Sequence, residues 1–202
     1  MLPLDSKRWA ELYHAYGNAS DVPEIVRKLR RTGEQKRWNN FLWDEIGGSL
    51  CHQGTVYTAT YAIVPYLVKL LRFTDEFQKF NLIALLGWIS GAGDRVASPA
   101  DLEADYKDSI KTAAGIGREL LLSQDFDQSD YIWLLDSVAG LHKCLEPDTK
   151  LNGLNNEQYE AYCPFCKEFL MVAVRESGFY SYAVDDSWKP ITDEIGAVRI
   201  FV

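Results

Sequence analysis

The sequence lacks any long, uninterrupted apolar segment. Its longest apolar run, Tyr61–Leu71, contains Pro65 and Lys69, whereas a helix needs about 20 consecutive apolar residues to cross a bilayer. Residues 1–5 are followed by charged side chains and do not begin the apolar core of a signal peptide. We therefore expect no membrane segment and a cytoplasmic location.

Basic residues are in the minority. The chain of 202 residues contains 21 Lys and Arg against 29 Asp and Glu, which gives a net charge of -8. Nucleic-acid affinity comes largely from cationic side chains that displace phosphate counterions, so a nucleic-acid partner is not expected. An acidic surface suits a basic protein partner, whose opposite field speeds the encounter. An acidic balance also serves solubility alone.

Cysteines are few, and only two of the four lie close together. Cys163 and Cys166 form a Cys-Pro-Phe-Cys motif that looks like half of a zinc ribbon, but a structural zinc site requires four ligands. Cys51 and Cys144 are isolated in the sequence. The pattern favours a motif that holds no metal, and zinc bound at Cys163 and Cys166 is the alternative.

The glycines form no nucleotide-binding signature. Gly87, Gly91 and Gly93 do not have the spacing of a dinucleotide-binding loop, and the sequence contains no Walker-type phosphate loop. Gly115 and Gly117 fall within a helical pattern, where we expect them to allow close packing between neighbouring helices. No catalytic residues are assigned.

A repeat organises the first half of the sequence. The segment that begins at Val22-Pro23 shares Val-Pro, an aliphatic residue, Val, a basic residue, Leu and Arg with the segment that begins at Val64-Pro65. The offset is 64 minus 22, or 42 residues, and Trp38-Asn39 aligns with Phe80-Asn81 at the same offset. A period of about 40–47 residues is typical of HEAT and armadillo repeats, whose units are packed helices.

The repeat predicts antiparallel helix pairs. Asp21 is expected to cap one helix, and Pro65 is expected to kink or break another near Tyr61–Val64. The predicted pairs are 21–32 with 34–48, 54–73 with 75–90, and 99–122 with a helix that begins at Asp127–Asp130.

An additional capping helix is predicted at the N-terminus. Trp9, Leu12, Tyr13 and Tyr16 have the spacing of residues on one helical face. His14 falls near the expected C-terminal end of this helix, where a cationic ring is favourable.

The C-terminal stretch changes to the periodicity of strands. Residues 169–175 and 179–184 are expected to form a β-hairpin, and 197–202 are a candidate third strand. We expect one domain, with helical repeats over 1–145, a connection over 146–160, and the Cys-x-x-Cys knuckle with the hairpin over 161–202. The expected fold class is mainly α: a short HEAT-like α-solenoid with a small C-terminal β-hairpin.

Two groups of residues are candidates for binding a partner. His52, Gln53 and Tyr57 are expected to gather at one end of the helical stack. Cys51 and His52 are neighbours in sequence, so their side chains are expected to diverge and not to form a nucleophile–base pair. The acids near residue 127 are the candidates for contact with a basic partner, although acids at helix starts usually cap the helix or face solvent. The candidate partner-binding residues are His14, Tyr16, His52, Gln53, Tyr57, Asp125, Asp127 and Asp130.

The sequence also resembles a family. The run 52–67, which contains His52-Gln53-Gly54 and Val64-Pro65, and the pattern of 9–23 are similar to stretches of little-characterised bacterial HEAT-like proteins. A pair similar to Cys163-Pro164-x-Cys166 before a short hairpin also recurs there. The resemblance implies an α-solenoid and no catalytic residues, and some members of the family look like immunity proteins that neutralise toxins.

These observations favour a non-enzymatic protein-binding module, and an immunity protein against a cognate bacterial toxin is its most specific form. The alternatives are an enzyme with a HEAT-like fold, either a DNA-glycosylase-like protein or a hydrolase, and a cytosolic scaffold protein. Zinc at Cys163 and Cys166 is the one candidate cofactor, and the sequence leaves the oligomeric state open.

Overall fold

The computed structural model describes residues 1–123, 125–144, 151–156, 158–162, 167, 169–175 and 178–183. The chain divides into two compact units, Met1–Thr149 and Lys150–Val202. The division falls within the connection predicted over residues 146–160. Described residues of the first unit are mainly helical, and those of the second form a small antiparallel sheet.

The first unit begins with a 3₁₀-helix, η1 (Lys7–Glu11), and a short hairpin of β1 (Tyr13–His14) and β2 (Gly17–Asn18). The predicted capping helix is therefore wrong. Trp9 and Leu12 are buried, but Tyr13 is 58% and Tyr16 70% exposed. The turn at Gly17 requires a φ of 137°, which a residue with a side chain rarely adopts.

The rest of the first unit consists of helices with three short strands between them. A segment of π-helix, η2, directly continues α2 and leads into α3, so the predicted helix 34–48 is present with a different internal geometry. The elements are α1 (Val22–Arg31), α2 (Gln35–Asn40), η2 (Phe41–Gly47), α3 (Gly48–Leu50), β3 (Cys51–His52), β4 (Thr55–Val56), α4 (Thr58–Leu70), α5 (Glu76–Gly91), β5 (Asp94–Arg95), α6 (Ala100–Ser123) and α7 (Gln128–His142).

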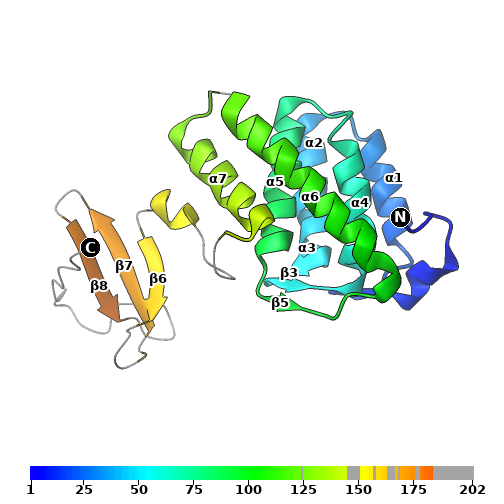
Figure 1. Ribbon diagram of the computed structural model, residues 1–202, viewed down its shortest axis with the longest axis horizontal. Coiled ribbons are helices and arrows are strands. Elements are labelled where there is room, and N and C mark those ends of the chain that lie inside the picture. The colour runs from blue at the N-terminus through cyan, green and yellow to red at the C-terminus, as the bar shows by residue number, and fades with distance from the viewer. Residues whose placement is uncertain are drawn as a thin grey trace. The chain divides into compact units, whose positions relative to one another are not determined.

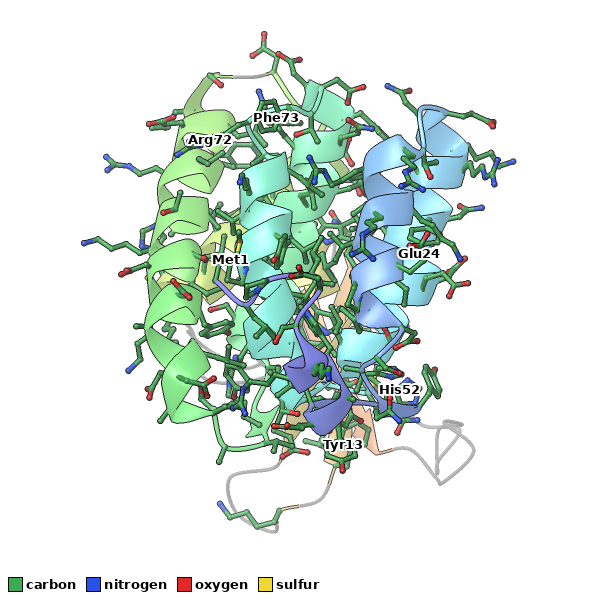
Figure 2. The ribbon with its side chains drawn as sticks, turned by 90° about the vertical axis from the view of Figure 1, so that its right-hand side faces the viewer. Met1, Tyr13, Glu24, His52, Arg72 and Phe73 are labelled. Atoms are coloured by element: carbon green, nitrogen blue, oxygen red, sulfur yellow. The ribbon has the colours of Figure 1, made fainter. Side chains whose placement is uncertain are left out.

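The helices stack in two layers (Figure 1). One layer contains α1, α4 and α6, which lie side by side in Figure 2, and α4 contacts both of its neighbours. The other layer contains α2 with η2, α5 and α7, and α5 contacts both of its neighbours. The two helices that carry the Val-Pro repeat, α1 and α4, are thus adjacent in the same layer.

The core centres on α4, which is buried at every position from Ala59 to Val68. A helix that is apolar on all sides is typical of a protein interior. Pro65 lies inside α4, and the helix continues through it to Leu70, so a break near Tyr61–Val64 is wrong, and the alternative, a kink, stays a prediction. Packing on all sides holds the helix together although Pro65 has no N–H to donate.

The α5–α7 contact is made through backbone. A Cβ built at Gly87 would lie 2.5 Å from the Ser137 Cα, and one built at Gly140 would lie 2.7 Å from the Gly87 carbonyl oxygen. Of the two glycines expected to allow close packing, Gly117 does so, since its Cβ would meet Val138 and Ile83 at 3.0 and 3.1 Å. The expectation for Gly115 is wrong, because nothing lies within 4 Å of its Cβ position.

The second unit contains a 3₁₀-helix, η3 (Leu151–Leu154), and a sheet with strand order β6-β7-β8. Strand β7 (Phe169–Arg175) pairs antiparallel with β8 (Gly178–Ala183), in the residues where the sequence predicted a hairpin. Strand β6 (Gln158–Tyr162), on the other side of β7, was not predicted. The candidate strand 197–202 lies outside the described residues.

None of the helices in the described part of the chain combines the length and the apolar character needed to span a bilayer.

Candidate functional site

A pocket with a volume of about 430 Å³ lies on the layer of α2, α5 and α7. Its size falls within the range of about 300–1,000 Å³ that is usual for ligand pockets. Five of its lining residues are aromatic. They are Trp43, Phe77, Phe80, Phe126 and Trp133, and they come from η2, α5, the segment before α7, and α7.

Four of these five aromatic rings form a continuous network, which does not include Phe77. The ring centroid of Trp43 is 6.1 Å from that of Trp133, which lies 6.3 Å from Phe80 in an edge-on arrangement. Phe80 in turn lies 5.8 Å from Phe126. Trp88 extends the network beyond the pocket, 6.3 Å from Trp43. Such spacings are typical of favourable aromatic pairs, so each ring helps to fix its neighbour.

Asn81 holds Trp43 in place. The indole Nε1–H of Trp43 donates a hydrogen bond of 3.0 Å to Asn81 Oδ1, and Asn81 Nδ2 donates one of 2.9 Å to the Phe77 carbonyl oxygen on the same helix. Asn81 is buried, with 7% of its surface exposed. Trp43 therefore has a fixed orientation, and its only hydrogen-bond donor is already used.

The polar lining is acidic or amide in character. Glu76 and Asp130 contribute carboxylates, and Asn39 and Asn81 contribute amides, with no Lys, Arg or His among the lining residues described. Desolvation by burial, and then the negative charge of Asp127, raise the pKa of Asp130 above its ordinary value. None of the ion pairs in the described part of the chain involves Asp130.

The structure divides the three predicted acidic candidates by role. Asp127 is the N-cap of α7, and its carboxylate accepts a 2.9 Å hydrogen bond from the backbone N–H of Asp130. Asp130 lines the pocket, whereas Asp125 is exposed and does not line it. The expected cap is present at Asp127, and contact of these acids with a basic partner stays a prediction.

The other candidates lie at the opposite end of α4. His52 precedes the start of that helix, whereas the pocket residue Glu76 follows its end. Figure 2 shows this separation, with Tyr13 and His52 at one end of the helices and Arg72 and Phe73 at the other.

His14, Tyr16 and His52 are brought together by two short hairpins, β1–β2 and β3–β4. The backbone N–H of Tyr16 donates to His14 Nδ1 at 3.1 Å, which leaves the imidazole proton on Nε2, 3.2 Å from Asp21 Oδ1. The Tyr16 hydroxyl lies 3.4 Å from His52 Nδ1. His14 is buried and both of its nitrogens are engaged, so it joins the β1–β2 hairpin to the start of α1.

Asp21 occupies the predicted N-cap position of α1, but its side chain makes no capping hydrogen bond. Its carboxylate is directed to His14 instead.

Gln53 and Tyr57 have local structural roles. Gln53, with a φ of 50°, and Gly54, with a φ of 81°, form the two-residue turn between β3 and β4. The backbone N–H of Tyr57 donates a 3.2 Å hydrogen bond to Thr60 Oγ1 at the start of α4. Cys51 is fully buried while the adjacent His52 is half-buried, which agrees with the expectation that the two side chains diverge.

The zinc hypothesis falls on residues that the structure does not describe, because Cys163 and Cys166 lie outside the described ranges. Within the described ranges, no group of three or more His, Cys, Asp or Glu side chains could hold a metal ion.

Sequence reasoning missed the aromatic pocket, although one signal pointed to it. The 42-residue repeat aligns Trp38-Asn39 with Phe80-Asn81, and both asparagines and Phe80 line the pocket. Trp43 and Trp133 carried no comparable signal.

Comparisons with family models, curated proteins and solved structures found no match to this chain.

Proposed function

We propose that this protein is a non-enzymatic protein-binding module, and most specifically an immunity protein that blocks a cognate bacterial toxin by occlusion. The observation that carries the proposal is the preformed aromatic pocket. Aromatic side chains with a fixed orientation are the usual anchors of protein interfaces, and Trp133 and Phe77 are each 42% exposed. The net charge of -8 would steer a basic partner toward such a surface.

The proposal includes a short HEAT-like α-solenoid. Its support is the alternation of layers, since α1, α4 and α6 stack beside one another and α2 with η2, α5 and α7 form the second row. The 42-residue offset relates α1 to α4 and Asn39 to Asn81. Solenoids of this kind offer broad surfaces to their partners, and the pocket opens on one such row. The proposed location is the cytoplasm.

The rival hypotheses have less support. A hydrolase would use Glu76 and Asp130, but both residues are exposed, and efficient acid–base catalysis needs a carboxyl group held against the reacting atoms. A DNA-glycosylase-like enzyme would need cations for phosphate, and none of the described lining residues is basic. A cytosolic scaffold would differ from an immunity protein only in its partner.

Co-purification and protection assays test the proposal. The chain is co-expressed with the product of the neighbouring gene, and we expect the two to purify together and the cells to survive. Trp133→Ala should weaken both effects, whereas Phe73→Ala, which removes an aromatic ring that is 79% exposed and outside the pocket, should leave them unchanged. Absence of both co-purification and protection would contradict the proposal.

A further inference from the structure

The aromatic pocket is suited to positive charge. Its walls are π-systems, whose negatively charged faces attract cations within about 6 Å of the ring centroid. The indole N–H of Trp43 is bound to Asn81, so Trp43 offers a guest its ring and not a hydrogen-bond donor. An anion would therefore find no donor on this residue.

The charged side chains around the pocket also favour a cation. Glu76 and Asp130 are the charged residues among the described lining, and both are acidic. Asp130 is exposed, and partial desolvation together with the neighbouring Asp127 charge raises the pKa of its carboxyl. A cation in the pocket would favour the ionised form of this carboxyl.

The nearby helix N-termini do not reverse this preference. The N-termini of α5 and α7 carry partial positive charge, which favours anions. Both are already capped within the chain, since Asp75 accepts a hydrogen bond from the Gln78 N–H and Asp127 accepts one from the Asp130 N–H. These carboxylates occupy the positions that an external anion would take.

From these observations we propose that the pocket of α2, α5 and α7 receives one cationic side chain, the ammonium group of a lysine or the guanidinium group of an arginine, presented by the protein partner. The inference rests on the proposed function, because it assigns the part of the partner that is recognised. The pocket volume of about 430 Å³ is large enough to admit one such side chain. Aromatic rings around a cationic head group are an established mode of recognition.

Titration of the full chain with small probes tests the inference. The probes are Nα-acetyl-lysine amide and Nα-acetyl-arginine amide, with Nα-acetyl-norleucine amide as the neutral match and acetate as the anion. Binding is followed by the indole N–H resonances of Trp43 and Trp133 in two-dimensional NMR spectra. We expect the two cations to shift these resonances in a saturable manner, and the neutral and anionic probes to leave them in place.

Substitutions in the pocket test whether the cationic probes bind there. Trp133→Ala and Asp130→Asn change exposed side chains, so the fold should tolerate them. Trp133→Ala should weaken binding of the cationic probes about two- to fivefold, the usual effect of one exposed cation–π contact. Asp130→Asn should weaken it by up to about fivefold, the usual effect of one exposed charge pair. Phe73→Ala should have no effect.

The possible outcomes separate the inference from the proposed function. Equal binding of the norleucine and lysine probes, saturable binding of acetate, or no shift with any probe would overturn the inference. A partner that binds the wild-type chain and Trp133→Ala equally would overturn the inference but leave the proposed function standing. Cation binding in a chain that has no protein partner would overturn the proposed function and the assignment to a partner's side chain, and only the cation preference of the pocket would stand.

Discussion

Gly87 occupies the point at which α5 and α7 come closest. An alanine Cβ there would lie 2.5 Å from both the Cα and the carbonyl oxygen of Ser137, and neither backbone atom can move away without shifting α7. Alanine favours a helix over glycine by about 1 kcal/mol, but overpacking a close contact costs about 1–3 kcal/mol. We expect Gly87→Ala to lower the free energy of unfolding, as measured by urea denaturation.

Gly115→Ala is the matched control. This glycine lies inside α6, is exposed, and has nothing within 4 Å of its Cβ position. The substitution should therefore raise the free energy of unfolding by up to about 1 kcal/mol through helix propensity alone. If the two variants changed stability in the same direction, backbone contact at Gly87 would not be the reason for its glycine.

Asp130 gives cation binding a pH dependence with a definite sign. The pKa of its carboxyl is raised, first by burial and then by the charge of Asp127, so the group is protonated over a wider acidic range than an ordinary aspartate. Only the ionised form attracts a cation. Affinity for Nα-acetyl-lysine amide should therefore rise with pH through the raised pKa, which NMR titrations between about pH 4 and about pH 7 would follow.

Two variants separate the contributions to this profile. Asp127→Asn removes the neighbouring charge and keeps an acceptor for the cap, so the rise in affinity should move to lower pH. Asp130→Asn should remove the increase in affinity that comes from ionisation of Asp130. Only the increase that comes from Glu76, the other carboxylate in the pocket, should then remain. An unchanged profile in Asp130→Asn would show that Asp130 does not face the guest.

At the scale of elements, the start of α7 offers a direct test of what its acids do. Asp127 is the N-cap and accepts the backbone N–H of Asp130 at 2.9 Å, whereas Asp125, two residues earlier, is exposed. Asp127→Ala should cost about 1 kcal/mol of unfolding free energy, the usual value of a cap. Asp125→Ala should stay within about 0.5 kcal/mol of the wild type, and thermal or urea unfolding of both variants would compare them.

The start of α7 was predictable from the sequence, because Asp127 was expected there and accepts a hydrogen bond from the helix. The helix predicted over 75–90 is present as α5, whose N-cap Asp75 was not recognised in the sequence. The N-terminal segment was not predictable in this way. Trp9, Leu12 and Tyr16 have helical spacing, but a glycine in the left-handed region at Gly17 allows a hairpin that exposes Tyr16 and buries His14.

The pocket could not be predicted because it depends on packing between distant segments. Trp43, Phe80 and Trp133 come from three different elements of the α2–α5–α7 layer, and their meeting depends on how closely α7 approaches α5. That approach is set by Gly87 and Gly140, because neither residue has a Cβ that would hold the two helices apart. The orientation of Trp43 depends further on the π-helical turn η2 and on Asn81, and no local sequence pattern encodes either.

At the scale of the whole molecule, the helical unit contains its own core. Every described member of the hydrophobic core cluster lies between Trp9 and Leu141, and the contact pattern separates residues after Thr149. A domain of about 150 residues buries enough surface to fold alone. We expect a chain that ends at Thr149 to unfold in one cooperative transition.

The shortened chain should also keep the cation-binding pocket, because all of its described lining residues fall between Asn39 and Trp133. Circular dichroism during urea denaturation would report the cooperativity, and the Trp43 and Trp133 resonances would report binding of Nα-acetyl-lysine amide. A gradual, non-cooperative loss of helix would contradict the prediction that the core closes within residues 1–149. A cooperative transition without probe binding, when the full chain binds the probe, would contradict the prediction that the helical unit holds the pocket by itself.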